Sequence, residues 1–545
     1  MHFKHKLSLA LLLLTISTIA QAERRERLID AWRPVHYEVS LAFDDKLSEL
    51  TKASTEITVL VLKDSVTAID LDFGEMSVDS VRVGGVPAKY SQSGGKLVVT
   101  FSQIPKRDEQ LKISVAYHGR PKDGLILIND KDGKPSATGD NWPDRVHNWI
   151  PCLDHPSAKA TVRFTVNAPA RDVVVANGQL ESTRPNSNKM QTWIWNESVP
   201  ISPYCMIICA GEFARLEAKD KTVTPLSYYV PQSDRKFAMQ GFAPAAPSLK
   251  LFTETVAPYP YEKLGLIVGA TRYGGMENSS AIVFASTLFK NFETPGQRSR
   301  TYNIPGNVER VVAHEIAHQW FGDSVTEATW ADLWLSEGFA TYFAGLFIER
   351  NEGEGEFRAY MKDAATKYFG YEKERKTPIH DLETENLNDL LNANNYEKGA
   401  WVLHMLRGML GDKAFFEGIR DYYASHRNST ATTEDLRAAL EKSSGMSLKD
   451  FFARWVYASG HPIYEATWSY SNGFIEIALR QTQEDGTPFL IPLTVELVSP
   501  DGTQRVTIKP DSKNFSTRIP LAHPPTDVRI DPDDFVLKEI TVKQQ

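Results

Sequence analysis

Cysteine is scarce in this chain, with only Cys152, Cys205 and Cys209 among 545 residues. A small, odd number of cysteines argues against a disulfide framework, so stability must come from large hydrophobic cores. Cys205 and Cys209 are expected on the same side of one strand, as small buried apolar residues too far apart for a bridge. Pairing of Cys152 with one of them across strands stays open.

Sustained runs of basic residues are also absent, and the formal net charge is −8 at pH 7. A protein that follows a phosphate backbone needs such a basic surface, so nucleic-acid binding is not indicated. The composition, with 42% hydrophobic and 24% charged residues, is that of an ordinary soluble globular protein. The length predicts three or four domains.

The chain also lacks a long apolar run at its start. Residues 1–6 are basic, residues 7–19 are mostly apolar, and Ala20-Gln-Ala22 has the small-x-small pattern of a cleavage site. This pattern predicts a secretory signal peptide over residues 1–22, because the apolar stretch is short for a transmembrane helix. A retained anchor is the alternative. We expect an exported protein, periplasmic or secreted, without stable membrane insertion.

The order of the expected elements indicates a multidomain α+β protein. Residues 23–218 alternate in short apolar segments separated by Gly, Asp and Pro turns, which predicts an N-terminal β-saddle or sandwich. Residues 219–460 begin with a few strands and continue into long helices, and residues 461–545 predict a small C-terminal β-sandwich. The helices are expected at residues 309–321, 337–351, 357–368, 398–410, 413–425 and 433–442.

Two histidines share one face of an expected helix. His314 and His318 are four residues apart, so their rings point at one location. Zn²⁺ favours imidazole nitrogens, and a site with three protein ligands keeps a fourth position for water, as catalytic sites do. Glu315 is displaced around the helix, where its carboxylate could take a proton from that water. The alternative is a metal-free core helix with hydrogen-bonded histidines.

A second helical segment, starting near Asp332, supplies the third candidate ligand. Glu337 follows His318 after eighteen intervening residues, and a returning helix could bring its carboxylate over the first. With this spacing the chain resembles the zinc aminopeptidases of the alanyl aminopeptidase (aminopeptidase N) family, whose signature is His-Glu-x-x-His, eighteen residues, then Glu. The resemblance implies one Zn²⁺ per chain, held by His314, His318 and Glu337. Thermolysin-like endopeptidases use the same ligand types at another spacing.

An upstream segment matches the Gly-x-Met-Glu-Asn signature of this family at Gly274, Gly275, Met276, Glu277 and Asn278. An exopeptidase must recognise a free α-amine, which a carboxylate beside the metal does through a charge-assisted hydrogen bond, and Glu277 is the natural candidate. The glycines would let the substrate backbone approach closely and pair with the strand edge. Taken alone, the segment would more often be a turn followed by a helix cap.

A third match covers residues 395–400, which contain the Tyr-x-Lys-Gly setting of the family. By resemblance, Tyr396 points at the carbonyl group of the bond that is cleaved. A phenol held about 2.7–3.1 Å from that oxygen would stabilise the negative charge that hydrolysis builds there. Without the resemblance, Tyr396 is an ordinary surface or interfacial tyrosine.

One family feature is missing. Members typically carry Gln-x-Glu ten to twelve residues before a cysteine that corresponds to Cys152, and that glutamate helps to hold the substrate amine. Here the segment contains Asp140 and Trp142 instead, so amine recognition rests mainly on Glu277. Asp140, Asn141 or Asp144 are candidates to replace the missing carboxylate.

The resemblance implies a thermolysin-like catalytic domain over residues 219–460 that releases single N-terminal residues from peptides with a free amino terminus. Larger family members continue into a helical-repeat domain that covers the active site. This chain stops before one, so we expect a more open cleft. Carboxylates outside the ligand set should orient the histidines, and Asp323, Glu327 and Asp332 are the nearest in sequence.

Three rival functions stay open. A metalloendopeptidase would use the same zinc chemistry without needing Glu277. A leukotriene-hydrolase-like dual enzyme shares the Gly-Gly-Met-Glu-Asn segment but carries a helical C-terminal domain. A non-catalytic zinc-binding scaffold would tolerate the loss of Glu315.

Overall fold

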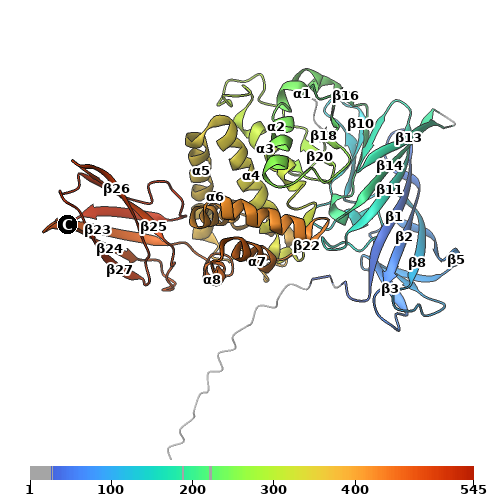
Figure 1. Ribbon diagram of the computed structural model, residues 1–545. Helices are drawn as coiled ribbons and strands as arrows, with labels where there is room; N and C mark the ends of the chain where they lie inside the picture. Colours follow the sequence, from blue (N-terminus) through green and yellow to red (C-terminus); the bar gives the residue numbers. More distant parts are fainter. Residues whose placement is uncertain (1–25, 28, 187–188, 220–223) are drawn as a thin grey trace, which may run out of the picture.

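The computed structural model describes residues 26–27, 29–186, 189–219 and 224–545, and the predicted signal peptide, residues 1–22, lies outside them. A β-rich N-terminal part, a largely helical central part and a β-rich C-terminal part follow one another along the molecule (Figure 1). The multidomain α+β fold expected from the sequence is therefore confirmed. Within the described ranges, every helix is too short or too polar to span a bilayer.

The N-terminal part consists of three sheets that share one core. Its strands are β1 (Trp32–Phe43), β2 (Leu50–Val61), β3 (Ala68–Asp72), β4 (Ser77–Val83), β5 (Val86–Pro87), β6 (Lys89–Ser93), β7 (Lys96–Thr100), β8 (Gln110–Gly119), β9 (Leu125–Asn129), β10 (Pro135–Gly139), β11 (Ala160–Pro169), β12 (Val173–Ala176), β13 (Gln179–Pro185), β14 (Met190–Ile201) and β15 (Ile208–Gly211). The large sheet has the order β13-β14-β11-β1-β2-β8-β4-β5, and the smaller sheets are β12-β15-β10-β9 and β3-β7-β6. In β1, Tyr37, Val39 and Leu41 are buried while the residues between them are partly exposed, so one face of the sheet packs on the core.

The central part begins with a five-stranded sheet. Its strands are β16 (Ala214–Glu217), β17 (Leu226–Val230), β18 (Leu264–Gly269), β19 (Gly275–Met276) and β20 (Ala281–Ala285), in the order β16-β17-β18-β20-β19. Because β16 pairs with β17, this sheet starts a few residues before the boundary expected at residue 219. The short strand β19 lies at one edge of the sheet, where a peptide backbone could add to it.

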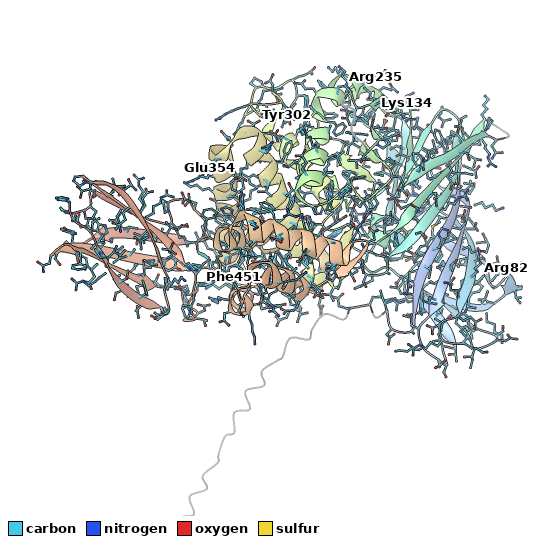
Figure 2. The ribbon with its side chains drawn as sticks, in the orientation of Figure 1. Arg82, Lys134, Arg235, Tyr302, Glu354 and Phe451 are labelled. Atoms are coloured by element: carbon cyan, nitrogen blue, oxygen red, sulfur yellow. The ribbon has the colours of Figure 1, made fainter. Side chains whose placement is uncertain are left out.

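Eight α-helices follow in the part of the central region that the structure describes. They are α1 (Arg235–Gly241), α2 (Ala245–Thr255), α3 (Gly306–His318), α4 (Trp334–Glu352), α5 (Glu354–Glu374), α6 (Gly399–His426), α7 (Thr433–Ser444) and α8 (Lys449–Trp455). Figure 2 labels Glu354 at the start of α5 and Phe451 in α8. The two helices expected at residues 398–410 and 413–425 both lie within α6, where the non-helical backbone of Gly411, with φ +76°, separates them as expected. Helices α1, α2 and α8 are additions to the expected set.

Short elements connect the longer strands and helices of the N-terminal and central parts. They are the 3-10 helices η1 (Val146–Asn148), η2 (Pro203–Cys205), η3 (Gln232–Asp234), η4 (Trp330–Asp332) and η5 (Leu387–Leu390), the π-helix η6 (Asn394–Lys398), and the paired strands β21 (Val325–Glu327) and β22 (Ser429–Ala431). Helix α3 ends three residues earlier than expected because Gly322, with φ +121°, reverses the chain and Asp323 N–H donates to the His318 carbonyl (3.0 Å).

The C-terminal part is the expected small β-sandwich. Its strands are β23 (Ile463–Ser471), β24 (Phe474–Gln481), β25 (Leu493–Ser499), β26 (Gly502–Ile508), β27 (Asn514–Pro520), β28 (Asp527–Ile530) and β29 (Glu539–Gln544). Two sheets, β27-β24-β23-β29 and β26-β25-β28, contribute to one core. In β24, Ile475, Ile477 and Leu479 point inward and alternate with exposed residues, as a sandwich requires.

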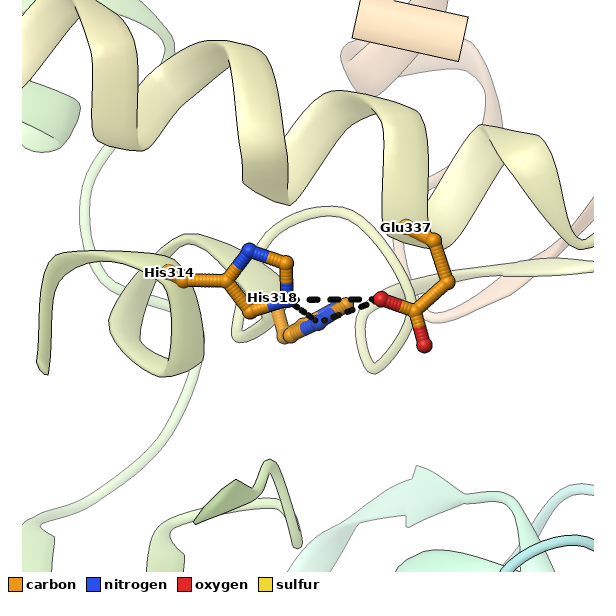
Figure 3. Close-up of side chains that lie close together, drawn as sticks. All are labelled: His314, His318 and Glu337. Atoms are coloured by element: carbon orange, nitrogen blue, oxygen red, sulfur yellow. Dashed lines mark hydrogen bonds and ion pairs between the residues drawn. The ribbon is translucent and has the colours of Figure 1, made fainter. Parts of the chain in front are cut away.

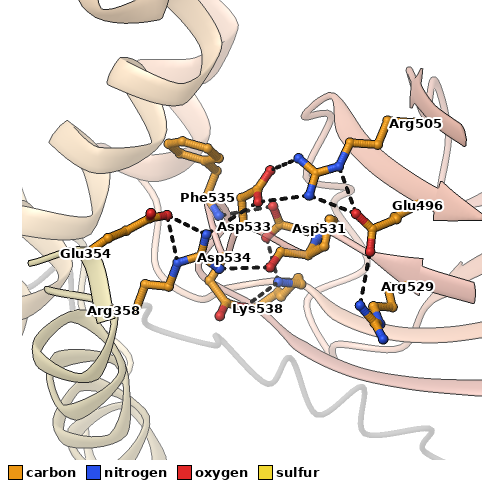
Figure 4. A network of polar contacts seen from close by, with 11 residues as sticks. Glu354, Arg358, Glu496, Arg505, Arg529, Asp531, Asp533, Asp534, Phe535 and Lys538 are labelled. Atoms are coloured by element: carbon orange, nitrogen blue, oxygen red, sulfur yellow. Dashed lines mark hydrogen bonds and ion pairs between the residues drawn. The ribbon is translucent and has the colours of Figure 1, made fainter. Parts of the chain in front are cut away.

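The sandwich contacts the helices through the segment after β28 (Figure 4). Arg358 of α5 donates hydrogen bonds to the Pro532 carbonyl (3.1 Å) and to Asp533 (3.4 Å), and Arg505 of β26 donates to Asp533 (2.8 Å). Phe535 lies so close to Gly408 of α6 that a Cβ there would be 2.5 Å from its ring. Polar and aromatic contacts together therefore join the two parts.

All three cysteines are buried and free, so the bridge left open for Cys152 is not formed. Cys209 lies in β15, but Cys205 lies in η2. The expectation that both occupy one strand is therefore wrong, because Pro203 begins a 3-10 turn that interrupts the extended segment.

Candidate active site

The three predicted metal ligands come from two packed helices. Val308, Val312 and Ile316 of α3 are buried in the core, and His314 and His318 project from another side of the same helix toward Glu337 of α4 (Figure 3). Glu337 lies in the first turn of α4. The structure thus brings together the residues that the spacing predicts.

Their distances fit a tetrahedral metal ion. The Nε2 atoms of His314 and His318 are 3.0 Å apart, and Oε2 of Glu337 is 3.3 Å and 3.4 Å from them. Ligand atoms held about 2.0–2.1 Å from a tetrahedral zinc ion lie roughly 3.3 Å from one another. Oε2 of Glu337 is buried and accepts no hydrogen bond from any described residue. The donor set therefore suits Zn²⁺ in both chemistry and spacing.

The orientation of His318 also suits a metal ligand. Its Nδ1 lies 3.1 Å from the Phe321 carbonyl and 3.0 Å from Oγ of Ser336. Because a carbonyl can only accept, Nδ1 carries a proton, and Nε2 faces the other two ligands. Burial alone would lower the pKa of His318, but the carboxylates of Glu277 and Glu337 raise it to about 10, so a metal ion must displace a proton from Nε2. Burial lowers the pKa of His314, which favours its neutral, ligating form. Burial alone would raise the pKa of Glu337, but the two histidines bring it down to about 2.

The expectation that a nearby carboxylate orients His318 is wrong. Asp323 accepts a hydrogen bond from Gln319 (2.8 Å), and Asp332 accepts from Thr433 (2.7 Å). Glu327 is buried without a hydrogen-bond partner among the described residues. The turn after α3 places the Phe321 carbonyl at Nδ1 of His318. The acidic side chains therefore contact other residues.

Removing the Ser336 hydroxyl should weaken metal binding. Ser336→Ala loses one of the two groups that hold the His318 ring, and loss of such a support typically lowers metal affinity by about 10- to 100-fold. The measurement is a zinc titration against a competing chromophoric chelator, with Ser336→Thr as the variant that keeps the hydroxyl. Equal affinity in Ser336→Ala and the unmodified protein would show that Phe321 alone sets the ring.

Glu315 lies beneath the strand edge rather than in open solvent. Gly275 of β19 is packed directly on it, since a Cβ at this position would be 2.2 Å from Oε1 of Glu315. Burial raises the pKa of Glu315 well above its ordinary value, and the nearby carboxylates of Glu277 and Glu337 add to the effect. A carboxylate in this setting retains a proton that it has accepted, as a proton carrier must.

Glu277 lies on the inner side of the site. Its carboxylate, that of Glu315 and a ring nitrogen of His318 lie within 4.8 Å of one another. Gln319 fixes its backbone, since Nε2 donates to the Glu277 carbonyl (2.6 Å) and Oε1 accepts from Ser280 N–H (2.8 Å). Burial raises the pKa of Glu277 to about 7. An ammonium group would compensate this buried carboxylate.

The other residues of segment 274–278 mainly stabilise its conformation. Met276 is buried in the N-terminal core, and the side chain of Asn278 donates to the Met276 carbonyl (3.2 Å). A Cβ at Gly274 would meet no atom within 4 Å, so this glycine faces open space. Of the five predicted residues, Glu277 and the edge at Gly274 and Gly275 are the ones placed to meet a ligand.

Tyr396, in η6, lies beside the metal ligands. Its ring is stacked on that of His314, with centroids 5.9 Å apart and planes at 8°. Burial and the nearby carboxylates of Glu337, Glu277 and Glu315 raise the pKa of Tyr396 well above its ordinary value, so it stays a hydrogen-bond donor. A π-helix is rare and is frequently found at functional sites.

A glycine contact sets the position of η6. Gly338, one residue after Glu337, faces Gly399 at the start of α6, and a Cβ on Gly338 would be 2.9 Å from the Gly399 Cα. The two helices can approach this closely only because neither residue has a side chain. The contact fixes Tyr396 relative to the metal ligands.

The candidates for the missing amine-binding carboxylate, Asp140 and Asp144, have other partners or lie among other charges. Asp140 is buried and contributes to the raised pKa of Glu277, but it already accepts hydrogen bonds from Arg145 (2.9 Å) and Thr271 (2.9 Å). Burial raises the pKa of Asp144 to about 7, and the charges acting on it come from Asp154, His147 and Asp72 rather than from the site.

Asn141 is likewise occupied. Its side chain donates to the Met206 carbonyl (2.5 Å) and accepts from the Trp149 indole (2.9 Å). Among the residues considered for amine binding, Glu277 is therefore the carboxylate that lies beside the metal ligands. Within the described residues, its carboxylate has no cationic partner in its own segment.

Three contributors escaped the sequence analysis: Gln319, Ser336 and Gly338. Gln319 and Ser336 each stand next to or near a predicted residue, but their roles depend on side-chain contacts across elements. Gly338 carried a usable signal, because a glycine inside an apolar helix costs about 1 kcal/mol relative to alanine and so has a packing reason when retained.

Two family profiles match the chain. The peptidase family M1 domain matches residues 244–455, and the peptidase M1 N-terminal domain matches residues 33–205. The His-Glu-x-x-His helix, its glutamate partner and the strand edge all lie within the first of these matches. The chain belongs to peptidase family M1.

Relatives extend this result. The chain is 31% identical to Aminopeptidase M1 of Arabidopsis thaliana over 367 residues, which cover 65% of this chain and 40% of that protein. It is 29% identical to Probable aminopeptidase 2 of Sulfurisphaera tokodaii over 475 residues, 85% of this chain and 58% of the relative. Probable aminopeptidase 1 of Saccharolobus solfataricus shares 26% over 482 residues, 86% and 59% of the two chains. The chain thus spans about half the length of these curated relatives.

Proposed function

We propose that this protein is a zinc-dependent aminopeptidase that releases single N-terminal residues from peptides. The observation that carries the proposal is the buried carboxylate of Glu277 within 4.8 Å of Glu315 and His318. Glu277 is buried, and Gln319 holds its backbone in place. A buried carboxylate fixed beside the metal ligands suits a free α-ammonium group, which favours an exopeptidase over an endopeptidase. The names of the relatives support the same activity.

The side chains divide the chemistry between them. Bound by His314, His318 and Glu337, Zn²⁺ would activate a water molecule and polarise the carbonyl group. Glu315 accepts the proton of the attacking water and delivers it to the leaving nitrogen as the C–N bond breaks.

Two further residues position the substrate. Glu277 binds the α-ammonium group by a charge-assisted hydrogen bond, which sets which peptide bond is cleaved. Tyr396 donates a hydrogen bond to the carbonyl oxygen as negative charge develops on it. The edge at Gly274 and Gly275 admits the substrate backbone beside β19.

A panel of aminoacyl anilides tests the reaction class. The substrates are offered with free and with acetylated α-amines, before and after treatment with a chelator and after zinc is restored. We expect hydrolysis of the free set alone, lost with the metal and regained with zinc. Cleavage of blocked substrates at similar rates would favour an endopeptidase, and no metal-dependent cleavage would favour a binding protein.

The role of Glu277 gives a more specific prediction. In Glu277→Gln the amide oxygen can still accept a hydrogen bond from an ammonium group but carries no negative charge, so kcat/KM on free aminoacyl anilides should fall by about 10- to 100-fold. Zinc content should be unchanged. The measurement is the ratio of kcat/KM for free and blocked substrates, and an unchanged ratio would remove Glu277 from amine recognition.

The proposal includes export. The basic start, apolar stretch and small-x-small site over residues 1–22 support a signal peptide and a periplasmic or secreted location. Amino-terminal sequencing of protein from whole cells and from the exported fraction tests it, with mature chains expected to begin at Glu23.

A further inference from the structure

One arginine lies a single helical turn before His314, on the same face of α3. Arg310 and His314 are four residues apart, as are His314 and His318. Exposure of these side chains rises along the helix, from 2% at His318 and 18% at His314 to 39% at Arg310. The metal-binding face of α3 therefore runs from the buried interior outward to Arg310.

The direction of a bound peptide follows from this gradient. Glu277 groups with His318 at the buried end of the ligand row, and Tyr396 stacks on His314 at the more exposed end. A substrate whose α-amine contacts Glu277 and whose carbonyl contacts Tyr396 must continue past His314. Its residues beyond the cleaved bond then approach Arg310.

The guanidinium group of Arg310 is available to a ligand. It donates no hydrogen bond to any residue within the described ranges, and its closest carboxylate, Asp363, is 4.0 Å away. Asp363 is closer to Lys367 (3.2 Å), which offsets its charge. The ring of Tyr360 lies 5.2 Å from the guanidinium carbon and supports it from one side.

Other arginines near this end of α3 are engaged. Arg300 donates to Glu356 (2.6 Å), and Arg298 donates to the backbone carbonyls of Asn303 (3.1 Å) and Phe292 (3.2 Å). Of the three arginines around this opening, Arg310 is thus the one with its planar set of donors still open, a geometry that matches a carboxylate.

A hollow adjoins Arg310. It has a volume of about 530 Å³ and is lined by residues of α3, the preceding loop and the ends of α4 and α5, which include Arg310, Glu309, Glu352 and Glu356. Glu352 and Glu356 already accept hydrogen bonds from Arg300 and Thr301. Four helical residues span about 6 Å, and an extended peptide advances about 3.3–3.6 Å per residue. A group one or two residues beyond the cleaved bond therefore comes within reach of Arg310.

We propose that Arg310 binds a carboxylate of the substrate one or two residues beyond the cleaved bond, so that short or acidic peptides are preferred. This proposal rests on the aminopeptidase function. The carboxylate can be the C-terminus of a short peptide or an acidic side chain, and both would make a bidentate, charge-assisted contact with the guanidinium.

The experiment compares five substrates: Ala-Ala-Ala, its amide, Ala-Ala-Asp-Ala-amide, Ala-Ala-Asn-Ala-amide and alanyl p-nitroanilide. The full-length zinc-loaded protein is measured beside Arg310→Gln and Arg310→Lys. Arg350→Gln, which removes an exposed charge from the end of α4, is the matched control. Release of alanine gives kcat and KM separately for each peptide.

We expect the unmodified protein to favour at least one carboxylate substrate over its neutral partner by about tenfold or more, mainly through KM. Arg310→Gln should abolish that preference, Arg310→Lys should restore part of it, and the anilide should change less than about twofold. Loss confined to the tripeptide pair identifies the C-terminus, and loss confined to the Asp/Asn pair identifies the side chain.

Two results would overturn the assignment of Arg310. One is an equal effect of Arg310→Gln on all five substrates, the anilide included, which marks a structural role. The other is the absence of any preference for carboxylates in the unmodified protein. Failure of the aminopeptidase function itself looks different, because the anilide would then not be cleaved by any of the proteins.

Discussion

Replacing Glu315 with glutamine should leave zinc binding intact and lower kcat by about 10²- to 10⁴-fold, the range for loss of a general base. The amide has nearly the shape of the carboxylate and so fits under Gly275, where a Cβ would be 2.2 Å from Oε1 of Glu315. It cannot, however, take a proton from water. None of the three ligands is changed, so the zinc content should stay normal while kcat falls.

The test measures zinc stoichiometry and kcat on a free aminoacyl anilide in the same samples. Glu417→Gln makes the same chemical change at an exposed position of α6 and should leave both values unaltered. A Glu315→Gln protein that carries zinc and turns over normally would exclude Glu315 as the base. A protein without zinc would mean that Glu315 helps to shape the ligand site.

The helical face that carries the site could be predicted because it depends on local geometry alone. Residues four apart in a helix share a face whatever surrounds them, so His314 and His318 are placed by their spacing. Glu337 needed the family spacing, since nothing local specifies that α4 returns across α3. The structure adds that the first turn of α4 brings its carboxylate within 3.4 Å of both imidazoles.

Contacts that depend on the course of a turn between two elements could not be predicted. The support of His318 by Phe321 and Ser336 depends on a tight turn at Gly322, where a Cβ would be 2.4 Å from Oγ of Ser336. The sequence suggested acidic residues because carboxylates often fill this role. The backbone carbonyl of Phe321, three residues after His318, takes this position instead.

The glycines of the strand edge also have a role that could not be predicted from the sequence. They were interpreted as room for the substrate backbone, and Gly274 faces open space as that interpretation requires. Gly275 has a second reason, its contact with Glu315 on a helix forty residues later in the chain. The same side chain that would exclude the substrate would also displace the base.

Replacing Glu337 with glutamine should abolish activity by a different route, through loss of the metal. Removing the support of a ligand typically costs about 10- to 100-fold in affinity, so removing the anionic ligand itself should cost more than about 100-fold. Without the charge of Glu337, two neutral nitrogens 3.0 Å apart remain to hold a divalent cation. A competition titration with a chromophoric chelator measures the affinity directly.

The two glutamate variants test each other. Glu315→Gln should be inactive with zinc bound, and Glu337→Gln should be inactive because zinc is absent, with partial recovery at high zinc concentration. The unfolding temperature in the presence and absence of zinc distinguishes a lost ligand from a collapsed fold, because zinc should stabilise Glu315→Gln and not Glu337→Gln. If Glu337→Gln still bound zinc tightly and stoichiometrically, another side chain would have to act as the third ligand. The candidates are Glu277 and Glu315, because one ligand atom of each lies within 4.8 Å of a ring nitrogen of His318.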